Sequence, residues 1–190
     1  MAEAARFVAG GAGAAGPLAQ TALGRVFVAG FTATAETWDA ARVLDRALAP
    51  PSLGSVRDAL AGRLPAAQRV LSRAMEGDRN GVHAIGVAVH NLAATLDALR
   101  ALDRALPQDE ALARALAAPA RVARQGTSVA ETVAGRVRPG SFVVLEVGAA
   151  AERTLDPRVT FLSEASSGCP AHAFVPRLTA RIWRAAGGAP

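Results

Sequence analysis

Residues 85–99, IGVAVHNLAATLDAL, are the stretch that decides the fold of this chain. Apolar residues recur here and just beyond it at spacings of three, four and seven, at Ile85, Val89, Leu92, Leu96, Leu99 and Leu106. This spacing places them on one side of an α-helix, where they form an apolar stripe suited to a core. We therefore predict a long helix over residues 82–106, ended by Pro107.

The same reasoning predicts four further helical stretches. Proline or glycine bounds each one: residues 34–49 before Pro50 and Pro51, residues 55–75 with an interruption at Pro65, a short helix from Asp109 and Glu110 to Pro119, and a last helix from Pro170 to Gly187. Acidic residues suit the first turn of a helix, and proline is favoured at its first position. The chain should therefore be mainly helical.

A small antiparallel sheet is expected between these helices and the last one. Residues 129–137 and residues 141–147 are rich in β-branched and apolar side chains, and Arg138-Pro139-Gly140 between them reads as a turn. We expect the two segments to pair with each other. The predicted fold class is thus mainly α with a small antiparallel β-sheet near residues 129–147.

The length and composition favour one domain with its own core. The chain has 190 residues, of which 51% are hydrophobic. We place this domain at residues 17–190, after a Gly/Ala-rich lead-in at residues 1–16. That lead-in contains Gly11, Gly13 and Gly16 with the spacing of a dinucleotide-binding loop, but Pro17 follows at once and no acidic residue closes the next apolar run. A helix start is the simpler interpretation, and a nucleotide-binding fragment is a weak alternative.

The charge pattern argues against a nucleic-acid partner. The net charge is +5 and all 21 basic residues are arginine, yet they are scattered singly, and only 4% of residues are aromatic. The longest uninterrupted apolar stretch, residues 85–89, is too short to cross a membrane. The single cysteine and the absence of a secretory signal pattern at the start favour a reducing, cytoplasmic location.

Cys169 is the one position where chemistry is expected. It directly precedes the predicted last helix, whose unpaired N–H groups and positive dipole end favour a thiolate. A thiolate can ligate iron or act as a nucleophile, whereas a lone cysteine is also common as a small buried apolar residue. His172 lies three residues on and could form a Cys–His pair. His83 and His90 share one side of the long helix but have no carboxylate ligand nearby, so we interpret them as a polar flank.

Several segments taken together, in order, resemble a shortened bacterial cytochrome P-450, from about Gly16 to the C-terminus. The matching segments are Ala88-Val-His-Asn-Leu-Ala93 in the long helix, Arg124-Gln-Gly-Thr127, Arg138-Pro139-Gly140, Ala151-Glu-Arg153 with Asp156-Pro157, and Gly168-Cys169-Pro-Ala-His172. The resemblance implies a haem-thiolate fold that is incomplete, because members of this family are roughly twice as long.

The resemblance also implies a cofactor and a role for particular residues. Cys169 would be the axial ligand of a haem iron, and Gly168 would let the backbone approach the macrocycle. Arg124 would pair with a haem propionate, and Ala88, Asn91, Leu92 and Ala93 would line the distal face. The implied activity is that of an oxidoreductase, either a monooxygenase or a peroxide-driven oxygenase, acting on a small apolar metabolite. A ferredoxin-type redox partner, or a second chain that completes the pocket, would accompany it.

The departures from the family pattern define the alternative. Glu110 and Arg114 are four apart rather than three, and Asn91, Leu92 and Ala93 replace the acid and alcohol that deliver protons to bound oxygen. The loop before Cys169 is also shortened. A protein that lacks proton delivery is suited to a different role, so the alternative is a haem-free accessory protein that binds and stabilises a partner enzyme.

Overall fold

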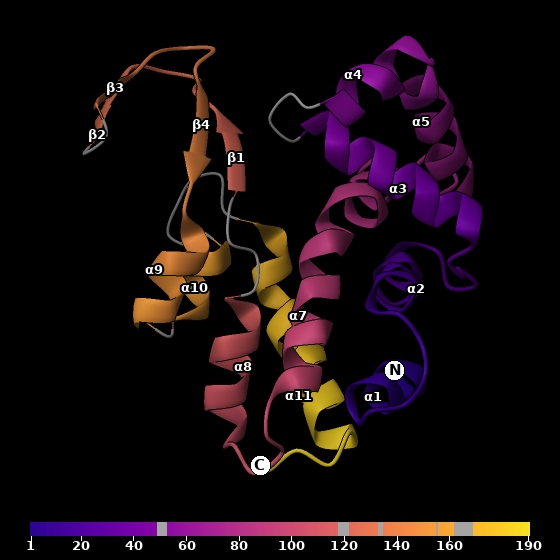
Figure 1. Cartoon of the computed structure of the whole chain (residues 1–190), viewed down its shortest axis with the longest axis vertical. Coiled ribbons are helices and arrows are strands. Elements are labelled where there is room, and N and C mark those ends of the chain that lie inside the picture. The colour runs from indigo at the N-terminus through magenta and orange to yellow at the C-terminus, as the bar shows by residue number, and fades with distance from the viewer. Residues whose placement is uncertain (49–52, 118–121, 133–134, 155, 162–168) are drawn as a thin grey trace.

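The computed structural model describes residues 1–48, 53–117, 122–132, 135–154, 156–161 and 169–190 (Figure 1). The α-helices are α1 (Ala2–Val8), α2 (Ala15–Phe27), α3 (Ala35–Leu48), α4 (Leu53–Leu60), α5 (Arg63–Ala74), α6 (Arg79–His83), α7 (Val89–Ala101), α8 (Gln108–Leu116), α9 (Val147–Thr154), α10 (Pro157–Phe161) and α11 (Val175–Ala185). A π-helical turn (Ala84–Ala88), a 3₁₀ turn (Pro170–Ala173) and the strands β1 (Val122–Gln125), β2 (Ala130–Thr132), β3 (Gly135–Val137) and β4 (Phe142–Leu145) complete the elements. The prediction of a mainly helical chain with a little antiparallel sheet is confirmed.

The long central helix is present, and its apolar stripe is buried as predicted. It runs from Arg79 to Ala101 through α6, the π turn and α7. The five stripe residues within this helix are at most 3% exposed: Ile85, Val89, Leu92, Leu96 and Leu99. The helix ends at Ala101 rather than near residue 106, because Leu102 adopts an extended conformation (φ −79°, ψ 149°). Leu106 therefore reaches the core from the following loop, where it is partly buried.

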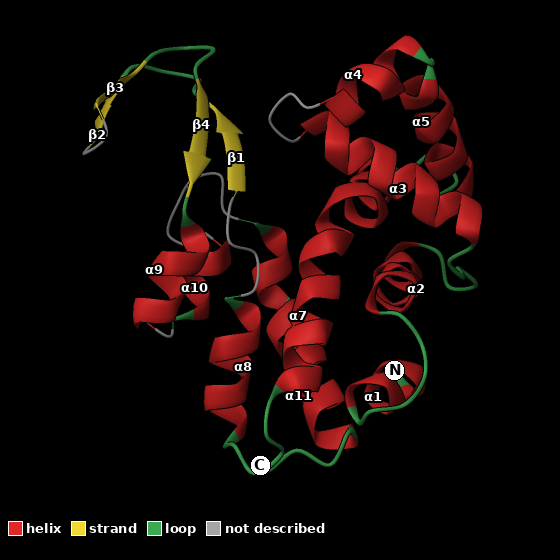
Figure 2. Ribbon diagram, viewed as in Figure 1, coloured by secondary structure: helices red, strands yellow, loops and turns green. Residues whose placement is uncertain are grey.

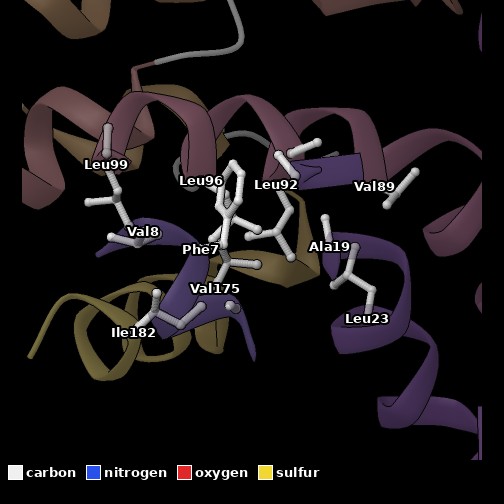
Figure 3. Packing of buried hydrophobic residues seen from close by; sticks show 14 of the residues in the cluster. Phe7, Val8, Ala19, Leu23, Val89, Leu92, Leu96, Leu99, Val175 and Ile182 are labelled. Carbon is white, nitrogen blue, oxygen red and sulfur yellow. The ribbon is translucent and has the colours of Figure 1, made fainter. Parts of the chain in front are cut away.

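The stripe connects two hydrophobic clusters. Val89, Leu92, Leu96 and Leu99 belong to the larger cluster, which α7 forms with α1, α2, α8 and α11 (Figure 3). Ile85 belongs to the smaller cluster, formed with α3 and α5. One helix thus supplies both cores, and the two ends of the helical body are joined through it.

A buried polar contact fixes the point where the π turn meets its neighbours. Gln20 of α2 is fully buried, and its Nε2 donates to the carbonyl oxygens of Ile85 (2.9 Å) and Thr37 (3.1 Å). Thr37 Oγ1 in turn donates to Gln20 Oε1 (2.8 Å). A π turn disturbs the regular ladder of helical hydrogen bonds, so the amide of Gln20 gives a buried carbonyl there a donor. The contact ties α2 to α3 and to the central helix.

The predicted helix over residues 55–75 is two helices, and the break lies before Pro65 rather than at it. Gly62 precedes α5 with a left-handed backbone (φ +62°) that favours glycine. Pro65 then falls in the first turn of α5, where its missing N–H would have no intrahelical acceptor. Helix α4 therefore ends at Leu60, and α5 begins at Arg63.

The predicted strand pairing is wrong, although both predicted segments contain strands. β4 pairs antiparallel with β1, with Arg124 opposite Val143, and β2 pairs with β3 as a separate hairpin (Figure 2). β2 and β3 both lie within the predicted strand 129–137 and pair with each other, and Gly135 at the start of β3 has a left-handed backbone (φ +113°). The turn at Arg138–Ser141 is confirmed: Ser141 N–H donates to the Arg138 carbonyl (3.0 Å), and Gly140 has φ +82°. β1 was missed because a four-residue strand containing arginine and glutamine has no alternating pattern.

Helix α1, within the segment predicted as a lead-in, is part of the folded core. Phe7 and Val8 of α1 are at most 3% exposed and lie in the larger cluster (Figure 3). Arg104 holds the end of α1: its guanidinium donates to the carbonyls of Val8 and Leu99 and lies 4.8 Å from the centre of the Trp183 ring. The apolar face of α1 was not recognised in the sequence, because alanine supplies much of that face.

The central helix has 23 residues. Judged by its length and composition alone, it could cross a membrane. The estimate from uninterrupted apolar residues missed this, because His90 and Asn91 interrupt the run without charging it. A central helix of a helical domain passes the same test, and this one already packs against α1, α2, α8 and α11. The finding is weak evidence for or against a membrane location.

A buried carboxylate joins the three helices α3, α4 and α5. Asp58 of α4 is 5% exposed, and its Oδ2 lies 2.7 Å from Arg46 Nη2 of α3. Its Oδ1 lies 3.0 Å from Arg63 Nη1 at the start of α5. The hydrogen bond from Arg46, together with the charges of both guanidinium groups, holds the pKa of Asp58 below its usual value.

We expect Asp58→Asn to lower the melting temperature at pH 7 and to lose this effect in acid. A carboxyl whose pKa is lowered by folding stabilises the protein above its ordinary pKa of 3.8, and this contribution disappears as the pH falls through the lower folded-state pKa. Thermal melts followed by circular dichroism between pH 7 and pH 2.5 measure the difference from wild type. Asp39→Asn, which removes an exposed carboxylate paired with Arg42, is the matched control. A difference for Asp58→Asn that stays constant down to pH 2.5 would contradict the assignment.

Candidate functional site

Cys169 is a free, partly exposed cysteine at the start of a single 3₁₀ turn. Its backbone N–H donates to the carbonyl oxygen of Phe161 (2.9 Å). The long terminal helix, α11, begins only at Val175, after a break at Phe174. The expected dipole of a long helix therefore does not start at this sulfur, and the prediction of one continuous helix from Pro170 is wrong.

Pro176 explains the break. In a continuous helix from Pro170 it would lie in the interior, where its ring clashes with the preceding turn and its missing N–H breaks the hydrogen-bond ladder. Restarting the helix at Val175 places Pro176 in the first turn of α11, where proline is tolerated. The sequence thus contained the signal for the break, which is Pro176, but the helix start had been predicted from Pro170.

His172 does not form a pair with the sulfur of Cys169. Its Nδ1 lies 2.9 Å from the carbonyl oxygen of Cys169, and its backbone N–H donates to the same oxygen (3.1 Å). The ring is exposed to solvent. This geometry closes the local turn and gives no support to a nucleophilic Cys–His pair.

The four residues predicted to line a distal face do not share one open surface. Leu92 is 3% exposed and Ala93 is 9% exposed, both within the larger core cluster. Asn91 is exposed, and Ala88 is half-buried at the end of the π turn. Arg124 lies in β1, and only its backbone is described; Gly168 lies outside the described residues.

These positions do not fit a haem against this side of α7. The cluster that contains Leu92 also contains Val175, Ile182 and Trp183, so side chains of α11 already fill the space that the stripe faces. A flat macrocycle would have to displace this packing. Among the residues that the structure describes, no group of three or more His, Cys, Asp or Glu side chains is placed to hold a metal ion.

The three glycines of the lead-in have packing and backbone roles. A Cβ at Gly16 would lie 2.3 Å from the Trp38 ring, and one at Gly11 would lie 2.8 Å from the Arg6 carbonyl oxygen. Gly13 has a positive φ of 137°. The element before them is helix α1 and not a strand, so the dinucleotide-binding context is absent here.

An open groove of about 670 Å³ lies beside these glycines, in the size range of small-molecule sites. Its walls come from α1, from the loop after α1 and the start of α2, and from α3 and α7: Phe7, Gly13, Ala14, Ala15, Gly16, Trp38, His90, Ala93, Ala94, Asp97 and Arg100. The Trp38 and His90 rings contact each other, with centroids 5.2 Å apart. Of the residues predicted to hold haem, Ala93 lines this groove, and Gly13 and Gly16 of the alternative nucleotide-binding loop line it as well.

Sequence reasoning missed this groove for a physical reason. Trp38 and His90 lie far apart in sequence, and the π turn between His83 and His90 changes the side of the helix on which His90 lies. His83 is exposed, whereas His90 is half-buried with its Nε2 3.4 Å from the Ala41 carbonyl oxygen. The only sequence signal was Gly16, whose lack of a side chain permits close contact with an aromatic ring.

We expect Gly16→Ala to destabilise the fold by about 1–3 kcal/mol, because the added methyl group would overlap the Trp38 ring. Urea unfolding followed by circular dichroism measures the change. Gly30→Ala is the matched control, since a Cβ at Gly30 meets no atom within 4 Å. Equal stability of both variants would show that Trp38 is not held against α2.

The haem hypothesis has a direct spectroscopic test. On the packing described, added hemin should give no stoichiometric Soret band, and the reduced, CO-treated sample should lack the absorption typical of thiolate ligation. Titration of wild type and Cys169→Ser in parallel is the measurement. A stoichiometric band present in wild type and absent in Cys169→Ser would overturn the interpretation and restore Cys169 as an axial ligand.

The comparisons with known proteins add no family. No protein-family model, curated protein or solved structure matches this chain. The cytochrome P-450 resemblance remains a prediction based on the residues quoted above, and the function has to be argued from the geometry.

Proposed function

We propose that this chain is a haem-free interaction protein that binds and stabilises a partner protein through helix α4. The observation that carries the proposal is the exposure of three apolar residues on this helix. Leu53 is 92% exposed, Val56 52% and Leu60 86%. We call these three residues the α4 surface.

The α4 surface lies on one side of the helix. Its residues are spaced by three and four, which aligns them along α4. Asp58, on the same helix, is buried and holds α4 to α3 and α5 through Arg46 and Arg63. The polar residue therefore faces the protein and the leucines face solvent, which reverses the usual arrangement of a surface helix. Exposed apolar clusters of this kind mark interaction sites.

The charge around the α4 surface defines the partner that suits it. Residues 53–75 contain four arginines and one acid, and that acid is the buried, doubly paired Asp58. Arg57, Arg69 and Arg73 are exposed. The helical pair α4–α5 lies at one end of the molecule, away from both termini (Figure 1). A partner with an apolar groove rimmed by carboxylates complements this surface, because an amphipathic helix docks its apolar residues in such a groove.

The haem-thiolate oxidoreductase is the second candidate. The observation that favours it is the partly exposed, free thiol of Cys169 close to the last helix. The hemin titration separates this candidate from the first, because an interaction protein of the kind proposed requires no cofactor.

We expect the variant Leu53→Asp/Leu60→Asp to lose partner binding without losing stability. Burial of each leucine in a groove is worth about 1.5–3 kcal/mol, so two charges there should weaken binding by well over tenfold. Because both side chains are exposed in the free protein, its unfolding free energy should change by no more than about 0.5 kcal/mol per site.

Site-specific photocrosslinking in cells measures the binding of the partner. A photoreactive residue at position 56 should give a discrete adduct with a second protein, which disappears in the Leu53→Asp/Leu60→Asp background and weakens at high salt. The same residue at Val129, which is 54% exposed on the β2–β3 side, is the matched control. Adducts with this chain alone, binding to anionic vesicles in place of a protein, or equal labelling from position 129 would each overturn the proposal.

A further inference from the structure

We infer that the groove beside Trp38 is a binding site for a small organic cation with a flat, apolar body. This site is separate from the α4 surface, and the inference does not depend on the proposed partner. The argument rests on the shape of the groove, its aromatic wall and its charges.

The wall of the groove is preorganised. The Trp38 ring packs where Gly16 leaves room for it, and it also contacts the His90 ring at 5.2 Å. The neighbouring Thr37 is held by Gln20, which in turn binds the carbonyl of Ile85 in the π turn. Trp38 is therefore fixed from two helices before any ligand arrives, and a rigid aromatic wall lowers the entropic cost of binding.

The lining of the groove suits a flat apolar body. Ala93 and Ala94 of α7 and Ala14 and Ala15 at the start of α2 offer only methyl groups. Phe7 also lines the groove, and the Arg100 guanidinium lies 4.5 Å from the centre of its ring. Because most lining residues are small or aromatic, their contacts with a ligand would be mainly apolar.

The charged group of the lining that is left for a ligand is Asp97. The Arg100 guanidinium keeps its charge, but it is directed to the Phe7 ring, and its Nη2 lies 3.4 Å from the Gly10 carbonyl oxygen. Asp97 lines the same groove, and its carboxylate makes no hydrogen bond or ion pair with any residue that the structure describes. Asp97 and Trp38 both line the groove. The carboxylate can form an ion pair with an ammonium group, while the indole ring packs against the apolar body of the same ligand.

Three probes of one size test this inference by isothermal titration calorimetry. They are phenethylammonium, the neutral 2-phenylethanol and the anionic phenylacetate. Phenethylammonium should bind at least about tenfold more tightly than 2-phenylethanol, which corresponds to about 1.4 kcal/mol. Phenylacetate should bind most weakly. When the titrations are repeated at several salt concentrations, the ratio of the affinities for phenethylammonium and 2-phenylethanol should fall as the salt concentration rises.

Variants assign the effect to the groove. Asp97→Asn should remove the preference for the cation over the alcohol but leave the alcohol's affinity unchanged. Asp109→Asn removes an equal charge on α8, outside the groove, and should keep the preference. Trp38→Leu should weaken all probes, with circular dichroism as a check on folding. Equal binding of the three probes, tighter binding of phenylacetate, no binding, or an unchanged preference in Asp97→Asn would each overturn the inference.

Discussion

The packing of one helical stripe against its neighbours is the constraint on which this structure depends. Residues 79–101 supply buried side chains to both hydrophobic clusters, with Ile85 in one and Val89, Leu92, Leu96 and Leu99 in the other. Removal of this helix would leave α1, α2, α8 and α11 without a common surface, and α3 would be joined to them only through its contacts with α2. Because the stripe residues are at most 3% exposed, little of the surface they bury is left for a ligand. The same packing that builds the core thus competes with a cofactor on that side of α7.

The π turn and Gln20 decide what lies on the other side. A π turn shifts the residues that follow it around the helix axis, so His90 comes to lie against Trp38. Gln20 satisfies a carbonyl of that turn and also holds Thr37 next to Trp38. Fold and groove therefore share a single buried polar contact. A groove made in this way is rigid at its aromatic wall and open at the charged end, where Asp97 lies.

Asp58 has a comparable double role at the other end of the molecule. Its two ion pairs hold α4 to α3 and α5, and they orient α4 so that Leu53, Val56 and Leu60 face solvent. Three exposed apolar side chains on one short helix cost free energy in water, and nothing within the described chain covers them. The ion pairs of the buried Asp58 explain how the helix keeps this orientation. Arg57 on α4 and Arg69 and Arg73 on α5 are exposed, which is why a partner with carboxylates is the natural complement.

The sequence by itself determined α3, α8, the central helix with its stripe and the turn at Arg138–Ser141, because these depend on local periodicity and on the backbone limits of proline and glycine. It did not predict α9 and α10. It also contained the reasons for the breaks before Pro65 and Pro176, although each break lies a few residues before the proline itself. Only the tertiary structure decided that β1 pairs with β4, that α1 belongs to the core, and that His90 lies against Trp38. Those outcomes depend on which distant surfaces meet, and a pairing between residues far apart leaves no spacing in the sequence from which to predict it. The candidate site at Cys169 was argued from local signals, whereas the groove and the α4 surface exist only once the helices are packed.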